Sequence, residues 1–278
     1  MLKRESPLTK RLSPFSLTLL APVEGCQYAP PIVVSDSSDE YEQLLAEVQR
    51  LRGRVAAAEG VNFSMLDASG RLVHASDRRS WIVVLRADDG HVSGTLRVTV
   101  HKSGCVVDDL DAVSSLMFVD PVWKTRGRQM LLSFLQRAHR ARVCVAETGG
   151  WVLEESIRRG MKGALLALSG WALTRLLGGA RILGVVTMKG GASRLTRYLG
   201  GVELCDAYGS MPPYFDHRYG STMEFVEFDS RRVNPIFEAS VSGLCEYFSG
   251  ISAVKPGESQ WECRSSEILS APTLRTLT

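Results

Sequence analysis

The fold is decided by residues 143–201, which read VCVAETGGWVLEESIRRGMKGALLALSGWALTRLLGGARILGVVTMKGGASRLTRYLGG. Apolar runs of strand length stand at Val143–Ala146 and Ile182–Thr187, and the pattern between them predicts an amphipathic helix over Met161–Leu177. A shorter helix should follow and end at Gly200. The order is therefore strand, glycine turn, helix, strand, helix, and a unit of this kind can hold a phosphate group at a helix start.

Two glycine-containing segments separate the first of these strands from the long helix. Thr148–Gly150 predicts a turn, and a basic segment, RRGMKG, stands next to the expected helix start. Glycines let the backbone approach a ligand, and cations add charge-assisted hydrogen bonds to a pyrophosphate. The residues that could do this are Arg158, Arg159, Gly160, Lys162 and Gly163. The alternative is that these glycines serve the geometry of a loop and bind nothing.

Composition limits the function classes. The chain has 278 residues, 45% of them hydrophobic, which is enough for one large domain or two small ones. A net charge of +3 does not indicate a nucleic-acid-binding protein. The five histidines and six cysteines show no spacing typical of a metal site, so no metal is predicted. No apolar run reaches the length of a membrane span, and we expect a soluble, cytoplasmic protein without membrane insertion.

The order of elements predicts one main domain. Residues 1–38 are rich in Ser, Pro and Asp and predict an unstructured tail, residues 39–233 the main domain, and residues 234–278 a helix followed by a polar tail. The remaining expected elements are a helix over 41–58, an antiparallel hairpin over 80–100, a helix over 123–142 and a strand over 223–228. The basic residues of the 123–142 helix are either a solvated face or a docking surface for an acidic partner.

Four side chains are candidates for a site, each with a structural alternative. Glu147 ends a core strand and is either a paired structural carboxylate or a general base. Arg97 is out of phase with its apolar neighbours on the returning hairpin strand, so it should face either solvent or a polar site. Asp77 could be its ion-pair partner or could bind a substrate amine. Trp151 belongs either to the core or to the lining of an apolar ligand tunnel.

The order of parts over residues 40–230 resembles the GNAT acyltransferase superfamily. RRGMKGALL is similar to the R-G-x-G-x-A-L-L segment of that superfamily, with Arg159 and Gly160 matching and Lys162 in place of the usual glycine. LTRYLGG resembles its L-Y-x-x-x-G-F segment, in which a tyrosine often acts as general acid. Thr196 stands at that position, and Tyr198 lies two residues away.

Within the superfamily, the motifs resemble the autoinducer-synthase branch, which holds acyl-homoserine-lactone synthases and long-chain N-acyl amino acid synthases. GTLRVTVH is similar to the G-S-x-R-L-L-P-T strand of that branch and places Arg97 on the motif arginine. Asp77 is similar in position to its acidic substrate-side residues, and Trp151 matches the tryptophan of its W-E-x-S-R segment. The resemblance implies an α/β fold with a mixed, mostly antiparallel central sheet flanked by helices.

The resemblance also implies an activity. An N-acyltransferase of this kind moves an acyl group from acyl-CoA or acyl-carrier protein to the amine of an amino acid-like acceptor by direct attack. Glu147 would take the proton of the amine, Asp77, Arg97 and Trp151 would contact the substrate, and the basic segment Arg158–Gly163 would hold the phosphate groups of the donor. The basic helix would face an acidic carrier protein. The alternative, favoured by Lys162 and Thr196 at motif positions, is a catalytically inactive GNAT-like binding or regulatory module.

Overall fold

A ten-stranded sheet forms the centre of the computed structural model, which describes residues 15–23, 32–158 and 160–256. Its strands are β1 (Phe15–Leu20), β2 (Val33–Asp36), β3 (Trp81–Ala87), β4 (Val92–Val100), β5 (Cys144–Leu153), β6 (Ala180–Thr187), β7 (Val202–Glu203), β10 (Tyr214–Asp216), β11 (Ser221–Asp229) and β12 (Ser252–Lys255). A small separate sheet pairs β8 (Cys205–Asp206) with β9 (Gly209–Ser210).

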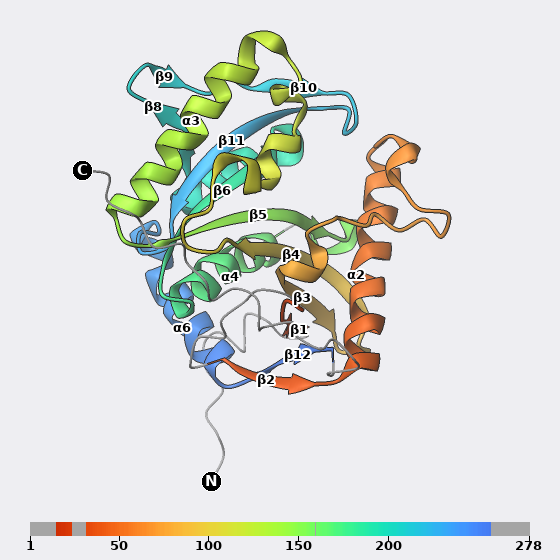
Figure 1. Cartoon of the computed structure of the whole chain (residues 1–278). Coiled ribbons are helices and arrows are strands. Elements are labelled where there is room, and N and C mark those ends of the chain that lie inside the picture. The colour runs from red at the N-terminus through yellow and green to blue at the C-terminus, as the bar shows by residue number, and fades with distance from the viewer. Residues whose placement is uncertain (1–14, 24–31, 159, 257–278) are drawn as a thin grey trace, which may run out of the picture.

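The strand order of the large sheet is β10-β11-β6-β5-β4-β3-β1-β12-β2, and β7 also pairs with β11 (Figure 1). Six of the nine pairings between its described strands are antiparallel, and three are parallel. The predicted α/β fold with a mixed, mostly antiparallel sheet is therefore confirmed. So is the hairpin, in which β3 and β4 pair around the Asp-Gly turn.

Five helices flank the sheet within the described part of the chain. They are α2 (Ser38–Ala58), α3 (Pro121–Arg140), α4 (Lys162–Leu176), α5 (Ala192–Leu199) and α6 (Glu238–Ser249). Because strand side chains alternate between faces, Leu96 and Val98 of β4 pack in one cluster with α4 and α6. Ile82 and Val84 of β3 pack on the opposite face against α2. Arg97 pairs with Ile82 in the ladder and shares this α2 face, as its phase in the sequence predicted.

Helix α4 is buried on all sides rather than amphipathic. Gly163–Thr174 is an unbroken run of buried residues, because the sheet covers one side of the helix and α6 covers the other. Phe248 and Val241 of α6 belong to the same cluster as Trp171 of α4. In the described part of the chain, no helix combines the length and the apolar composition that crossing a membrane requires.

The prediction of an unstructured N-terminal tail is wrong for two segments. Six residues of β1 pair with β3 in antiparallel register, and β2 pairs with β12 in parallel. Leu17 and Leu19 of β1 lie in the main core, and Leu20 is buried on the other face of the sheet. The polar residues on both sides of β1 gave no indication of a strand, and its partner β12 comes from the opposite end of the chain. The helix predicted after residue 233 is present as α6, and β12 behind it joins the sheet. Residues 257–278, predicted as a polar tail, lie outside the described residues.

Candidate active site

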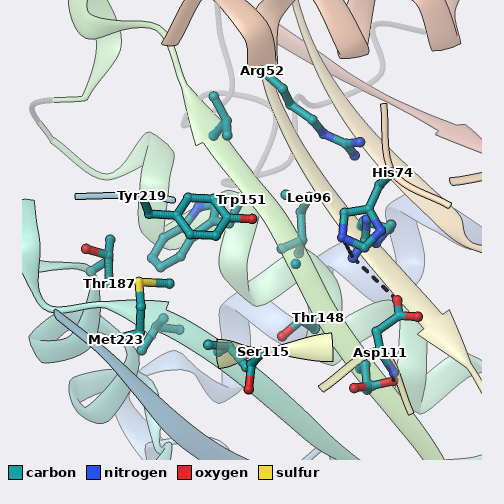
Figure 2. Close-up of a pocket in the computed structure, with 18 of the residues that line it drawn as sticks. Arg52, His74, Leu96, Asp111, Ser115, Thr148, Trp151, Thr187, Tyr219 and Met223 are labelled. Carbon is teal, nitrogen blue, oxygen red and sulfur yellow. Dashed lines mark hydrogen bonds and ion pairs between the residues drawn. The ribbon is translucent and has the colours of Figure 1, made fainter. Parts of the chain in front are cut away.

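The sheet opens between β5 and β6. The two strands pair in parallel only from Cys144 and Ala180 to Thr148 and Gly184. Beyond that point β5 continues beside β4, whereas β6 continues beside β11. A cavity of about 530 Å³ lies at this opening and is lined by residues of both strands and of α2 and α4 (Figure 2). The strand–helix–strand unit that the sequence predicted therefore forms a ligand-sized cleft.

A β-bulge in β5 shapes one wall of this cavity. The sequence predicted a turn at Thr148–Gly150, but these residues lie inside the strand. Gly149 pairs with Arg97 and Val152 pairs with Thr95, so β5 carries one residue more than β4 over this step. Gly150 has a φ of +57°, and a Cβ atom there would lie 2.8 Å from Arg52 Nε. A Cβ on Gly149 would lie 3.0 Å from Arg97 Nη2. The two glycines thus make room for two guanidinium groups.

These guanidinium groups belong to an arginine–aspartate cluster, defined as Arg52, Asp77, Arg97 and Asp111. Arg52 Nη1 lies 2.6 Å from Asp77 Oδ1, and both side chains are only 2% exposed. Arg97 lies 3.7 Å from Asp77 through Nη1 and 3.6 Å from Asp111 through Nη2. Burial acts to raise the pKa of Asp77, but the charge and hydrogen bond of Arg52 outweigh it and hold that pKa below its usual value. Asp77 and Arg97, singled out in the sequence, therefore lie together.

Several buried polar atoms of the cluster make no hydrogen bond to the described residues. Within the described residues, Nε and Nη2 of Arg52, Nε and Nη1 of Arg97 and Oδ2 of Asp111 make no hydrogen bond. All three residues line the cavity. Buried polar groups in proteins are nearly always hydrogen-bonded, so unpartnered groups at a cavity wall indicate a place for a ligand. The free donors suit a carboxylate, and the free acceptor suits an ammonium group.

His74 extends the cluster and was not identified from the sequence. Its Nδ1 contacts Ser76 Oγ at 3.0 Å, and its Nε2 lies 3.4 Å from Arg97 Nη2. Arg97 can only donate, so Nε2 accepts and the ring is neutral. Burial and the charge of Arg97 lower the pKa of His74 to about 4, which agrees with a neutral ring. Figure 2 shows His74 on the same side of the cavity as Arg52 and Asp111.

This pKa predicts a pH dependence of stability. A histidine whose folded pKa is depressed binds its proton better when unfolded, so stability should fall as the pH drops from 6.5 towards 4. We expect a loss of about 2 kcal/mol in the free energy of unfolding between pH 7 and pH 5. The pKa values of Asp77 and Asp111 are lowered as well, but both carboxyl groups stay ionised between pH 7 and pH 5 in the folded and in the unfolded protein. They change the stability only at a lower pH. Urea unfolding at pH 7 and pH 5 measures this loss in wild type and in His74→Gln. The loss should be smaller in His74→Gln, and an equal loss in both proteins would contradict the lowered pKa of His74.

Glu147 is buried and held by three hydrogen bonds. Its Oε2 contacts His101 Nε2 at 2.7 Å and accepts from the N–H of Asp111 at 2.7 Å. Its Oε1 accepts from the N–H of Ala112 at 2.8 Å. The carboxylate thus fixes the start of the short 3₁₀ helix η4 (Asp111–Ser114), which carries the aspartate of the cluster. Glu147 also lines the cavity.

The described residues among those expected to hold donor phosphates do not line this cavity. Arg158 donates to the Leu153 carbonyl at 3.0 Å and pairs with Glu59 at 2.6 Å. Lys162 Nζ lies 4.7 Å from the centre of the Phe15 ring on β1. Gly160 has a φ of +108°, in the left-handed region that favours glycine. Gly163 packs tightly at the start of α4, and Arg159 lies outside the described residues.

The aromatic wall of the cavity combines expected and unexpected residues. Trp151 lines the cavity and also packs against the main core. Trp171 and Phe228 meet edge to face, with ring centroids 4.7 Å apart, and both line the cavity. The cavity therefore joins the arginine–aspartate cluster to an apolar end. Tyr219, from the turn between β10 and β11, enters the same cavity and was not identified from the sequence.

Three cations of the basic helix α3 are paired within the chain. Arg126 pairs with Asp206 at 2.8 Å, Arg128 pairs with Asp108 at 2.7 Å, and Arg137 pairs with the buried Glu227. These contacts favour the interpretation of the basic residues of this helix as a structural and solvated face rather than a docking surface. In the described part of the chain, no group of three or more His, Cys, Asp or Glu side chains could hold a metal ion.

Neither a protein-family model nor a curated protein matches this chain. Among solved structures, the CoA-dependent acyl-homoserine lactone synthase BjaI with SAM and isopentyl-CoA gives a TM-score of 0.52 at 13% identity, over 88% of this chain and 95% of that one. BjaI with MTA gives 0.51 at 14% identity over the same shares. TofI in a ternary complex with an inhibitor and MTA gives a TM-score of 0.50 at 14% identity, over 82% of this chain and 100% of that one. The chain therefore has the fold of the acyl-homoserine lactone synthase BjaI.

Proposed function

We propose that this protein is an N-acyltransferase that moves an acyl group from acyl-CoA or acyl-carrier protein to the amine of an amino acid-like acceptor. The observation that carries the proposal is the cavity between β5 and β6. One end of it holds charged groups with atoms that make no hydrogen bond to the described residues, and the other end is apolar. An acceptor with charged groups and a donor with an acyl chain need this combination. The likeness to a synthase structure that holds SAM and isopentyl-CoA supports it at the level of the fold.

The acceptor would bind in the arginine–aspartate cluster. Its carboxylate would accept hydrogen bonds from the free N–H groups of Arg52 and Arg97. Its amine would lie near Asp77 and Asp111, whose carboxylates sit within 4 Å of Arg97. A site built to pair both charges discriminates strongly against an acceptor that lacks one of them, because buried groups are then left unpaired.

The donor would approach from the start of α4. The backbone N–H groups after Gly160, together with Arg158, Arg159 and Lys162, would hold its phosphate groups, and Gly163 would keep the helix start close to β5. Arg158 would have to exchange its partner Glu59 for a phosphate. The acyl chain would lie along Trp151 and Trp171. Acyl-CoA is the simpler donor, because three cations of α3 are already paired within the chain.

Glu147 would take the proton of the attacking amine, directly or through a water molecule. Its Oε1 accepts one hydrogen bond in the described contacts, which leaves a second lone pair for this task. The amine would attack the thioester carbon, and the thiol would leave. No covalent intermediate on the protein is required, so the positioning of the two substrates supplies much of the rate.

A thiol-release assay tests this function. Acyl-CoAs of graded chain length are offered with a mixture of amino acids, and the amide product is identified by mass spectrometry. The preferred amino acid is then compared with the amine that lacks its carboxylate, and kcat/KM should fall by at least about tenfold. Equal rates for the two acceptors would contradict the acceptor site.

The second candidate is a GNAT-like binding or regulatory module without catalysis. Two observations favour it: the Glu147 carboxylate is held by three hydrogen bonds, and the Thr196 hydroxyl donates to the Ala192 carbonyl of its own helix at 2.8 Å. Retained CoA binding without thiol release from any donor would establish this candidate and end the enzyme hypothesis. Calorimetric titration with CoA measures the binding.

A further inference from the structure

Acyl transfer from a thioester needs a proton donor for the departing sulfur, and helix α5 does not supply one. Thr196 faces the cavity, but its hydroxyl donates to Ala192 O at 2.8 Å. Tyr198 is 55% exposed and packs edge to face on Phe237, with ring centroids 5.4 Å apart. Tyr198 does not belong to the cavity lining within the described residues. The hydroxyl that serves the leaving group must therefore come from another element.

Tyr219 presents a hydroxyl in the required place. It lies in the turn between β10 and β11 and lines the cavity opposite the arginine–aspartate cluster. Figure 2 shows its ring inside the cavity, with the hydroxyl pointing towards Leu96. No hydrogen bond joins this hydroxyl to the described residues. It is a free donor inside the cavity.

The turn that carries Tyr219 is fixed on three sides. Arg218 binds the buried Asp216 through Nη2 at 2.7 Å and Nε at 3.0 Å. The Arg218 carbonyl accepts from the N–H of Asn62 at 2.9 Å, which ties the turn to the connection that follows α2. Arg218 Nη1 also donates to the Ser114 carbonyl at 3.4 Å. These contacts hold the turn in one geometry, and a catalytic group needs such support.

The environment keeps the Tyr219 phenol protonated. Burial raises its pKa, and the charges of Arg218 and Arg97 offset this only in part. Tyr214, the other tyrosine at the cavity, stacks on Phe225 with centroids 5.8 Å apart, and burial raises its pKa to about 12. Tyr219 and Arg97 line the same cavity, in which acceptor and donor would meet.

We propose that Tyr219 is the general acid that protonates the leaving thiolate. The acceptor nitrogen forms a bond to the thioester carbon, the carbon–sulfur bond breaks, and its electron pair goes to sulfur. The Tyr219 O–H gives its proton to that sulfur, and the free thiol leaves. The phenolate then regains a proton equivalent to the one that Glu147 took from the amine, so the protons balance. This inference rests on the proposed N-acyltransferase function.

Two donors with different leaving groups test the inference. Thiol release is measured for wild type, Tyr219→Phe and Tyr198→Phe, with an acyl-CoA and with the thiophenol ester of the same acyl group. Tyr219→Phe should lower kcat with acyl-CoA by about 100-fold and leave the KM of both substrates unchanged. An aryl thiolate is a stable leaving group that needs no proton, so the same variant should lose less than about fivefold with the thiophenol ester. Tyr198→Phe, which changes a tyrosine outside the cavity, should match wild type with both donors.

The outcomes distinguish a failure of the role of Tyr219 from a failure of the proposed N-acyltransferase function. An active wild type with an unchanged Tyr219→Phe overturns the role of Tyr219 alone. An equal loss with both donors also overturns it, because the hydroxyl would then act on the carbonyl oxygen or on the structure. A loss confined to Tyr198→Phe would place the acid on α5 instead. A wild type that releases no thiol from any donor ends the proposed function, and the inference falls with it.

Discussion

Asp77→Ala is expected to lower the free energy of unfolding by about 3–5 kcal/mol, because it removes one partner of a buried ion pair. Arg52 lies 2.6 Å from the Asp77 carboxylate and is 2% exposed, so it would keep its charge without water or a counter-ion. Gln49 and the backbone N–H of His74 also donate to Asp77 at 3.1 Å and would lose their acceptor. Urea unfolding followed by tryptophan fluorescence at pH 7 measures the change.

A second ion pair between the same two elements provides the control. Arg78, beside Asp77 in the short helix η2 (Asp77–Arg79), binds Glu42 of α2 at 2.8 Å, but both side chains are about half exposed. Glu42→Ala should therefore cost less than about 1 kcal/mol. Similar losses for the two alanine variants would mean that burial does not decide the contribution of Asp77. Asp77→Asn keeps an acceptor for Gln49, so its loss of unfolding free energy should lie between the losses of Asp77→Ala and Glu42→Ala.

The local elements could be predicted from the sequence because their patterns are local. The hairpin of β3 and β4 follows from strand alternation around an Asp-Gly turn, and the ends of α5 follow from glycines of positive φ. The strands near the termini could not be predicted in this way. β1 gains its hydrogen bonds from β3 and β12, and β12 comes from the far end of the chain. A strand of six residues carries too short a pattern to reveal such partners.

The candidate site shows the same division between local and long-range information. The phase of Arg97 in β4 predicted that it leaves the apolar face, and Asp77 was named as its possible partner. Arg52 is one of three arginines at alternate positions of α2, and nothing in that local pattern shows which of them the helix turns inward. Tyr219 lies in a turn that is bound to Asn62, in the connection after α2, and this contact joins segments that are distant in the sequence. Contacts of this kind are created by the fold.

Gly150 was expected in a turn from the local sequence, but in the fold it makes the space for Arg52 of α2. We expect Gly150→Ala to destabilise the protein by about 1–2 kcal/mol through its φ of +57° alone, because an L side chain is strained there. A Cβ atom would also meet Arg52 Nε at 2.8 Å and Cζ at 2.9 Å, so the guanidinium must move away from its position. The displaced Arg52 would lose its pairing with Asp77, and the total loss should reach about 3–4 kcal/mol.

Gly70→Ala isolates the contribution of Arg52 to this effect. Gly70 has a φ of +74°, but a Cβ atom there meets no atom within 4 Å, so only the backbone strain remains. The difference in unfolding free energy between Gly150→Ala and Gly70→Ala therefore measures the displacement of Arg52. If the proposed acceptor site is correct, Gly150→Ala should also raise the KM of the amino acid by about tenfold or more, with the KM of the donor unchanged. Equal stabilities of the two variants, together with an unchanged acceptor KM, would show that Gly150 serves only the backbone of the bulge.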